Sequence, residues 1–471
     1  MTEAHGLAEL AASGAAIHLV GIGGAGMAGL ALLLAARGAV VSGCDREHNE
    51  TTADLERRGM KIHQGHSPDH ADGQAALVHT AAVPADHPEL DRARARGTPV
   101  LKRSDALAEL VNAGSLIAVA GTHGKTTTSA LTAMALESAG VDPTALVGGR
   151  VPAWGGNARM GGMTFVVEAD EYDRSFLALW PEVAVITSVE AEHVDTYASF
   201  EEMERAFDEF VSHVAGDGHV IACVDDAGAR RRLAMAADRG IGYGIGDDAV
   251  LRARTVSYER ECTRFTANWG GRRLGTFELA LRGPHNLRNA LAVLAVMMAL
   301  ELDPQAAAPA FAGFSGVERR FQNLGVAAGV TVIDDYAHHP TEVAATLETA
   351  RQAFAGHRLV VAFQPHLYTR TRAFAQEFGE TLADADLVFV TEIYPAREQP
   401  IPGVSARLVV DAARRFADEE RVRYAEDLND LIGQLRQALQ DGDVFITLGA
   451  GDISSVAHSL LDELGRKHVD D

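Results

Sequence analysis

A glycine turn at residues 121–128 constrains the fold more than any other feature, because it lies between an apolar run at 115–120 and a helical stretch that ends near Gly140. Its Gly-Lys-Thr at 124–126 is similar to a Walker A loop, in which backbone amides, a lysine and a hydroxyl bind nucleotide phosphates and Mg²⁺. The turn departs from the full motif because Val119 stands where a first glycine is usual. The order strand, glycine turn, helix is typical of a parallel α/β sheet.

Lysine is rare in this chain, so each lysine carries information: the four are Lys61, Lys102, Lys125 and Lys467. A Gly-Lys-Thr that occurs by chance at a helix start is therefore disfavoured. We predict that Lys125 binds the phosphates and that Thr126 binds Mg²⁺. The residues of this turn predicted to bind ATP are Gly121, Thr122, His123, Gly124, Lys125, Thr126 and Thr127.

Short apolar runs followed by helical stretches recur in three parts of the chain. This alternation is typical of parallel α/β units. The length of 471 residues, at about 150 residues per domain, predicts about three domains. We expect an α/β fold with domains at 1–112, 113–324 and 325–471.

An earlier glycine turn at residues 21–26 also follows an apolar run and precedes a helical stretch. Its Gly-x-Gly-x-x-Gly spacing lets backbone amides approach a phosphate at a helix N-terminus. Asp45 ends the next apolar run and is placed to bind a ribose hydroxyl, so the literal interpretation is an NAD-dependent enzyme. A tight turn that only packs a helix is the other interpretation, and the turn alone does not decide which phosphate compound binds.

Acidic stretches follow two further apolar runs in the central part of the chain. Glu168 opens one after the run at 164–167, and His193 lies in another after the run at 183–187. The carboxyl ends of parallel strands meet at one sheet edge, and oxygen ligands gathered there suit Mg²⁺. An imidazole is a less natural Mg²⁺ ligand, so His193 standing alone would be assigned to a helix cap or to the core.

The charge and cysteine content of the chain exclude several classes of protein. Lys+Arg is 42 against Asp+Glu 65, and the net charge of −23 disfavours binding to nucleic acid and to anionic membranes. The three cysteines lie far apart, which supports neither a disulfide framework nor a thiolate metal site. The start of the chain lacks the basic residues of a signal peptide, and the apolar stretch at 17–41 is too interrupted to span a bilayer. We therefore expect a cytoplasmic protein.

The chain resembles the Mur ligase family over nearly its whole length, and within that family the branch that adds alanine. One glycine motif is weak support for such an assignment, whereas many motifs in family order are strong support. The resemblance rests on residues 21–27, 121–128, 168–171, 190–197, 283–290, 319–321, 334–340, 364–366, 369–371 and 449–452.

The resemblance implies a Rossmann-like domain for a UDP-sugar, a central P-loop-type ATPase domain and a Rossmann-like C-terminal domain for an amino acid. The implied reaction joins L-alanine to the carboxylate of UDP-N-acetylmuramate through an acyl phosphate, in peptidoglycan precursor synthesis. It implies ATP and Mg²⁺, with Mn²⁺ as an alternative ion. The partners would be these small molecules, and the enzyme would be a monomer or a homodimer.

The resemblance also assigns residues to each ligand, by matching position. His285, Asn286 and Asn289 would hold the adenine, and Arg320 would contact the phosphates of ATP. His338 or a carboxylate would take the proton of the attacking amine. The UDP-sugar would bind at Gly21, Gly23, Gly24, Ala25, Gly26, Met27 and Asp45, the metal at Thr126, Glu168 and His193, and the amino acid at Tyr336, His338 and Arg370, with Lys125, Glu168, His193, His338 and Arg370 catalytic.

Departures from the family pattern narrow the assignment. Leu367 stands where many relatives carry a first arginine, so Arg370 would bind a carboxylate without a second arginine. No lysine occurs between Lys125 and Lys467, which removes the carbamoylated lysine used by the ligases that act later. The alternatives are a tripeptide-recycling ligase, an NAD-dependent oxidoreductase built on residues 21–26, and a nucleotide-gated binding module without turnover.

Overall fold

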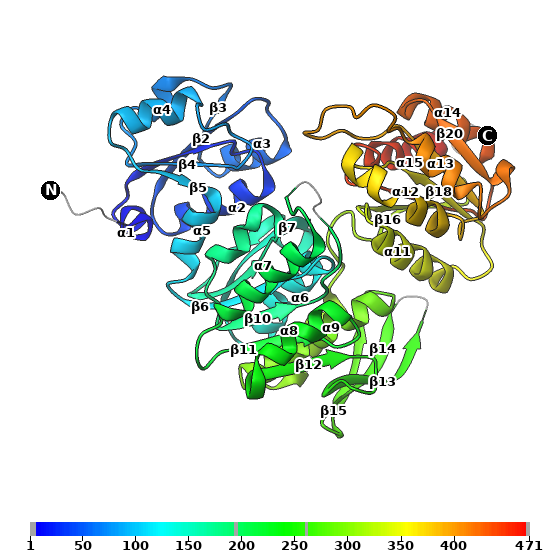
Figure 1. Ribbon diagram of the computed structural model, residues 1–471, viewed down its shortest axis with the longest axis horizontal. Coiled ribbons are helices and arrows are strands. Elements are labelled where there is room, and N and C mark those ends of the chain that lie inside the picture. The colour runs from blue at the N-terminus through cyan, green and yellow to red at the C-terminus, as the bar shows by residue number, and fades with distance from the viewer. Residues whose placement is uncertain (1–5, 193–195, 260–261, 468–471) are drawn as a thin grey trace.

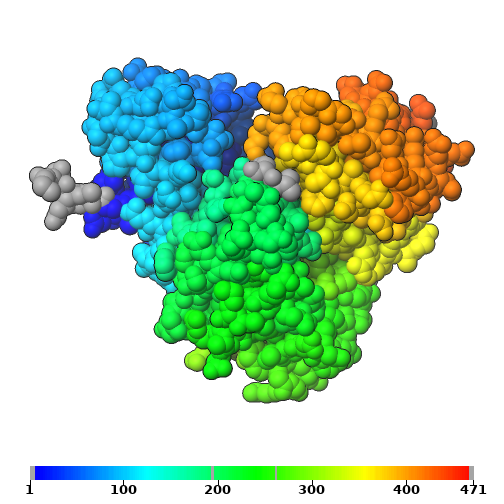
Figure 2. Space-filling view, viewed as in Figure 1, coloured from blue at the N-terminus to red at the C-terminus, as the bar shows by residue number. Residues whose placement is uncertain are grey.

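The computed structural model describes residues 6–192, 196–259 and 262–467. The chain forms three lobes, each built on its own sheet, which we call the N-terminal, central and C-terminal lobes. The N-terminal and C-terminal lobes lie side by side above the central lobe (Figures 1 and 2). The predicted three-domain α/β fold is confirmed.

The N-terminal lobe has a parallel sheet in the order β3-β2-β1-β4-β5. β1 lies between β2 and β4, so the earlier glycine turn, which follows β1, lies where the strand order switches direction, the usual ligand position in such sheets. The elements are α1 (Leu7–Ala12), β1 (Ala16–Val20), α2 (Ala25–Ala36), β2 (Val40–Asp45), α3 (Glu50–Arg57), β3 (Lys61–Gln64), the 3-10 turn η1 (Pro68–Ala71), β4 (Ala76–His79), α4 (Pro88–Ala95), β5 (Val100–Lys102) and α5 (Arg103–Val111).

The central lobe has a ten-stranded sheet in the order β15-β14-β13-β12-β11-β10-β6-β9-β7-β8. Its strands are β6 (Ser115–Ala120), β7 (Pro143–Val151), β8 (Gly156–Arg159), β9 (Thr164–Glu168), β10 (Val183–Ile186), β11 (His219–Cys223), β12 (Gly240–Gly244), β13 (Leu251–Tyr258), β14 (Thr263–Trp269) and β15 (Arg272–Leu279). Its helices are α6 (Lys125–Ser138), α7 (Phe200–Ser212), α8 (Ala227–Met235), α9 (Pro284–Ala299) and α10 (Ala308–Gly313), with 3-10 turns η2 (Pro152–Trp154), η3 (Tyr172–Ala178), η4 (Ala237–Arg239) and η5 (Pro304–Ala307). Residues 290–297 of α9 are all buried, because this helix is apolar on every side and lies inside the lobe.

The C-terminal lobe has a six-stranded sheet in the order β16-β17-β21-β18-β19-β20, parallel except for the edge strand β16. β16 begins at Gln322, inside the predicted central range 113–324. The elements are β16 (Gln322–Ala327), β17 (Val330–Asp335), α11 (Pro340–Ala353), β18 (Leu359–Phe363), α12 (Tyr368–Leu382), β19 (Leu387–Thr391), α13 (Arg407–Ala413), η6 (Glu419–Arg421), β20 (Val422–Ala425), α14 (Leu428–Ala438), β21 (Val444–Leu448) and α15 (Ser454–Lys467).

The apolar cores show which lobes are joined. One continuous cluster of buried side chains runs from the N-terminal lobe into the central lobe, whereas the C-terminal lobe has separate clusters on the two faces of its sheet. The C-terminal lobe therefore has a core of its own. Within the described ranges, no helix is both long and apolar enough to cross a bilayer.

Candidate active site

The turn between β6 and α6 has the strand–turn–helix context that the sequence predicted. Gly121 has φ +131°, and a Cβ there would lie 2.1 Å from Thr187 Oγ1. Gly124 has φ +80°, and its Cβ would lie 2.7 Å from Asn289 Oδ1. Both positions therefore require glycine, because the backbone is left-handed and a side chain has no room.

Lys125 lies at the first position of α6 and is held by groups around the turn. Its Nζ donates to the Gly121 carbonyl oxygen at 2.6 Å and lies 2.8 Å from Glu171 Oε2. Burial alone lowers the pKa of Lys125, but the carboxylates of Glu171, Asp170 and Glu168 hold it above its ordinary value. The ammonium is therefore charged at neutral pH, at a place where few waters screen it.

Thr126 and Glu168 bring oxygen atoms together beside the turn. Thr126 Oγ1 donates to Glu168 Oε1 at 3.0 Å, and Glu168 Oε2 accepts from the Gly148 amide at 2.5 Å. Burial raises the pKa of Glu168. A hydroxyl and a carboxylate fit a hard cation such as Mg²⁺, which favours a charged carboxylate. The third predicted ligand, His193, lies outside the described residues.

A pocket of about 330 Å³ lies between the central and C-terminal lobes. This volume falls at the low end of the range of small-molecule sites, about 300–1,000 Å³. Gly121, Thr122 and Lys125 are not on its wall. The predicted nucleotide-binding residues that line it are His123, Gly124, Thr126, Thr127, His285, Asn286, Asn289 and Arg320.

The predicted adenine residues stand at the start of α9, where this buried helix reaches the pocket. Burial, together with Arg288 and Arg320, lowers the pKa of His285 to about 4, so its ring is neutral. His285 Nδ1 is buried without a hydrogen-bond partner. A buried polar atom in this state is uncommon and suits a ligand that supplies the missing partner.

His123 connects two lobes through carboxylates. Its Nε2 lies 3.4 Å from Glu190 Oε2, and its Nδ1 lies 3.4 Å from Glu342 Oε1 on α11. Burial disfavours the imidazolium, but the two carboxylates raise the pKa of His123 to about 10. The sequence did not lead us to predict a role for Glu342. The usable signal was its position four residues after His338 near the start of a helix, because residues at this spacing face each other.

Arg370 forms a second connection between these lobes. Its Nε donates to Glu192 Oε1 at 2.9 Å, and both side chains are buried. Its Nη1 lies 3.0 Å from His366 Nδ1. Leu367, at the position of the absent arginine, is buried with φ +70°, so its side chain packs in the core. The predicted amino-acid site therefore lies at the lobe boundary.

His338 and Tyr336 lie near this arginine in the same lobe. His338 Nδ1 lies 2.9 Å from the Tyr336 carbonyl oxygen, which can only accept a hydrogen bond. Nδ1 therefore carries the proton, and Nε2 has the free lone pair. Burial is the main cause that lowers the pKa of His338 to about 4, so the ring is neutral at pH 7.

The earlier glycine turn is held by the next strand. Its Gly23 amide donates to Asp45 Oδ2 at 2.8 Å, so the carboxylate that the sequence assigned to a ligand also supports the turn. The Gly21 amide donates to the Cys44 carbonyl oxygen at 2.9 Å. Gly21, Gly23 and Asp45 do not line the pocket beside this turn.

That second pocket, about 220 Å³, opens between the N-terminal and central lobes. Arg103, at the start of α5, was missed, although a cation directly after a strand at the same sheet edge was a usable signal. Glu168 also lines this pocket and accepts a hydrogen bond from Thr126, so one carboxylate lies close to both glycine turns. Among the predicted UDP-sugar residues, Gly24, Ala25, Gly26 and Met27 line it.

Family models match three segments of the chain. Residues 16–114 match a model described as Mur ligase family, catalytic domain. Residues 119–297 match the Mur ligase middle domain, and residues 319–451 match the Mur ligase, glutamate ligase domain. Together these segments cover most of the chain in the order that its motifs predicted.

Individual proteins agree with these models. A UDP-N-acetylmuramate–L-alanine ligase from Nitratidesulfovibrio vulgaris is 43% identical over 441 residues, which are 93% of this chain and 97% of that protein. The crystal structure of a UDP-N-acetylmuramate–alanine ligase from Thermotoga maritima is similar with TM-score 0.82 and 29% identity, over 97% of this chain and 100% of that one. A murein peptide ligase from Psychrobacter arcticus, at 24% identity and TM-score 0.70 over 96% and 99% of the two chains, shares the fold. The chain belongs to the Mur ligase family.

Proposed function

We propose that this chain joins L-alanine to the carboxylate of UDP-N-acetylmuramate, with ATP converted to ADP and phosphate, as a step of peptidoglycan precursor synthesis. Near full-length identity to ligases of that name supports the reaction. The structural observation that carries it is the position of Glu168, which lies against Thr126 of one glycine turn and on the pocket wall of the other. A UDP-sugar bound at the N-terminal turn and ATP bound at the central turn would therefore lie next to each other at Glu168.

In the first step the muramate carboxylate attacks the γ-phosphorus of ATP, ADP leaves, and an acyl phosphate forms. The negative charge that gathers there needs cations in fixed positions. Lys125, His123 and Arg320 supply three of them, because each is charged at neutral pH. Bound Mg²⁺, held by Thr126 and Glu168, would neutralise charge on the phosphates, and Mn²⁺ would use the same oxygen ligands.

In the second step the amine of L-alanine attacks the acyl carbon, and phosphate leaves from the tetrahedral intermediate. The attacking nitrogen must lose a proton. Neutral His338 has a lone pair on Nε2 to receive that proton, and its ring is fixed by the Tyr336 carbonyl. Arg370, with its charge buried at the lobe boundary, would bind the carboxylate of L-alanine.

We also propose that the enzyme works in the cytoplasm, where ATP and the UDP-sugar are available, as a monomer or a homodimer. Light scattering of the purified chain measures the oligomeric state directly.

Phosphate release tests the reaction. The chain is supplied with ATP, Mg²⁺ and UDP-N-acetylmuramate, and then with L-alanine, L-serine, glycine or the cell-wall tripeptide in separate assays. We expect L-alanine to stimulate release most, and product mass to show one added alanine. Stimulation by the tripeptide instead would identify a recycling ligase, and absence of phosphate release with every amine would indicate a nucleotide-gated binding module without turnover. The oxidoreductase interpretation of residues 21–26 fails, because those residues lie within a Mur ligase domain.

A further inference from the structure

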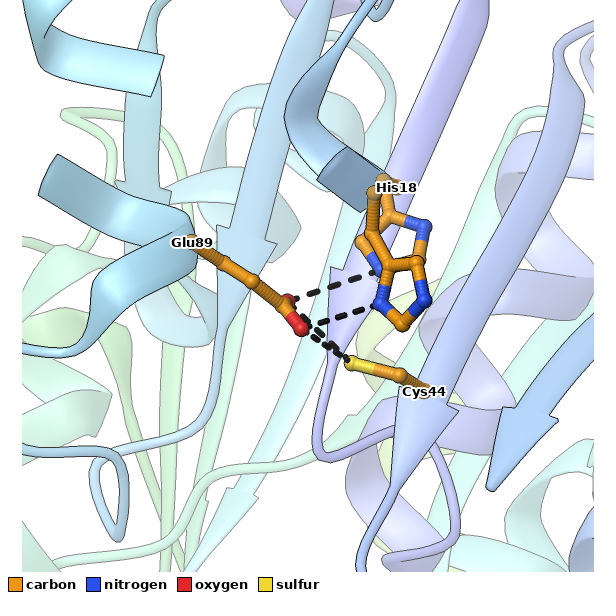
Figure 3. Close-up of side chains that lie close together, drawn as sticks. His18, Cys44 and Glu89 are labelled. Carbon is orange, nitrogen blue, oxygen red and sulfur yellow. Dashed lines mark hydrogen bonds and ion pairs between the residues drawn. The ribbon is translucent and has the colours of Figure 1, made fainter. Parts of the chain in front are cut away.

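A cluster of metal-binding side chains lies in the N-terminal lobe, outside the active site. Its members are His18 on β1, Cys44 on β2, His70 on η1 and Glu89 on α4. One ligand atom from each lies within 4.8 Å of all the others. Figure 3 shows His18 and Cys44 converging on the Glu89 carboxylate. Spacing along the sequence gave no sign of this cluster, because its members are distributed over four elements.

The distances within the cluster fit one small cation. Zn²⁺ binds nitrogen, oxygen and sulfur at about 2.0–2.3 Å in a tetrahedral arrangement. Two ligand atoms of such a site therefore lie roughly 3.3–3.6 Å apart. Glu89 Oε2 lies 3.2 Å from Cys44 Sγ and 3.7 Å from His18 Nε2. Glu89 Oε1 lies 3.0 Å from His70 Nδ1. The other three side chains therefore lie near coordination distance from the Glu89 carboxylate, and one ligand atom from each of the four lies within 4.8 Å of the rest.

His18 gives an independent indication of a ligand. Its side chain is 1% exposed, and Nε2 is buried without a hydrogen-bond partner. Its other ring nitrogen, Nδ1, lies 2.9 Å from Ser42 Oγ, a contact that fixes the ring with Nε2 facing Glu89. Metal-binding histidines are usually oriented in this way through the second nitrogen. An imidazole nitrogen that is buried, faces a carboxylate at 3.7 Å and has no hydrogen bond suits a metal ion.

We propose that His18, Cys44, His70 and Glu89 form a structural site for a borderline transition metal, with Zn²⁺ as the best fit. Thiol, imidazole and carboxylate ligands favour Zn²⁺ over Mg²⁺. The Cys44 thiol releases its proton to solvent when sulfur binds the metal. His66, whose Nδ1 lies 3.2 Å from Cys44 Sγ, flanks the site.

The site would act on the UDP-sugar turn through the backbone. The Cys44 carbonyl oxygen accepts from the amides of Gly21 and Ile22, at 2.9 and 3.1 Å. A metal that ties β1, β2, η1 and α4 together would therefore also hold the start of this turn. Its role is structural, because the ligands are mostly buried and lie outside both pockets.

Cobalt substitution tests the site in the untagged full-length chain. The protein is depleted with a chelator, supplied with excess Mg²⁺ to fill oxygen-ligand sites, and titrated with Co²⁺. We expect a thiolate-to-cobalt charge-transfer band that saturates at one equivalent. Cys44→Ser should lose that band, and Cys262→Ser, a thiol in another lobe, should keep it. Absence of the band, or its survival in Cys44→Ser, would overturn the proposal in favour of a hydrogen-bonded network around Glu89.

A second variant guards against misfolding of Cys44→Ser. His70 lies on a short 3-10 turn, and its side chain is 14% exposed. His70→Gln is therefore the substitution in the cluster that we expect to disturb folding least. We expect Zn²⁺ to raise the melting temperature of the depleted wild-type chain, and to raise that of His70→Gln much less. Equal shifts in both proteins, or no shift in the wild type, would contradict the site.

Discussion

The two glycine turns share one backbone arrangement but differ in their side chains. Each follows a strand whose two neighbours in the sheet run parallel to it, and each leads into a helix, at residues 21–26 and 121–126. The first contains no ionisable side chain, whereas the second contains His123 and Lys125. A carboxylate supports each turn: Asp45 accepts from a backbone amide in the first, and Glu171 pairs with the lysine in the second. We infer that the backbone of both turns binds phosphate groups, and that the side chains decide between holding a substrate and moving a phosphoryl group.

The surroundings of the turns differ as well. The first lies in a lobe whose apolar core continues into the central lobe. The second faces the C-terminal lobe, and the contacts that reach it there are charged, such as His123 with Glu342. We infer that the UDP-sugar binds on a fixed support, while the ATP and amino-acid site depends on how two lobes meet. Variants in the two turns can separate these roles.

The largest effect is expected for Lys125→Ala, which removes one of the two side-chain charges that distinguish the second turn. Turnover should fall by about 10³-fold or more, because a preorganised cation at the transferring phosphoryl group is lost. Phosphate release measures the loss, and binding of UDP-N-acetylmuramate by calorimetry should persist. Lys61→Ala, at the exposed first residue of β3, is the matched control and should be fully active. Retained turnover in Lys125→Ala would remove the proposed distinction between the turns.

The next largest effect is a pH dependence of folding stability that arises from His123 in the second turn. The pKa of His123 is raised from 6.5 to about 10 in the folded chain, so the folded state binds the proton more tightly than the unfolded state. The resulting stability is fully present below pH 6.5 and is lost as pH rises toward 10. The free energy of unfolding should therefore fall more steeply with pH in the wild type than in His123→Gln, by on the order of 1 kcal/mol per pH unit. Parallel curves from urea unfolding across this window would contradict the assigned charge.

A smaller effect should separate the glycines of the two turns. Gly121→Ala forces an alanine to φ +131° and against Thr187, whereas Gly24 has φ −75° and its Cβ would meet nothing closer than 3.8 Å. Gly121→Ala should lose about 1–3 kcal/mol from backbone strain alone, and ATP binding with it. Gly24→Ala should fold normally. Urea unfolding measures both, and equal stability of the two variants would show that the second turn tolerates a side chain.

The smallest effect is expected for Asp45→Ala in the first turn. It removes the acceptor of the Gly23 amide, which costs about 0.5–1.5 kcal/mol of folding stability. Affinity for UDP-N-acetylmuramate should weaken, and affinity for ATP should stay unchanged, as calorimetry with each ligand would show. A parallel loss of ATP affinity would mean that the turns are coupled.

The sequence predicted local geometry well and distant contacts poorly. The turn at Lys125 could be recognised because its strand, glycines and helix are neighbours in the chain. Their order alone predicts the backbone conformation of a phosphate-binding turn. The contact of His123 with Glu342 could not, since it depends on how two lobes pack. The same holds for Arg370 with Glu192, and for Cys44 with Glu89, where isolated cysteine positions suggested no metal site. Periodicity and spacing do not encode such tertiary contacts.

The lysine enclosed by the second turn also provides a chemical reporter. No other lysine lies between Lys102 and Lys467, and Lys125 is paired with Glu171 and 12% exposed. Acylating reagents react with the neutral form of a lysine amine. The raised pKa of Lys125 keeps the fraction of this neutral form low. Lys125 should therefore be modified more slowly than exposed Lys61. Mass spectrometry of the peptide that contains residue 125 would then report how tightly the second turn encloses Lys125, without a label or an introduced cysteine.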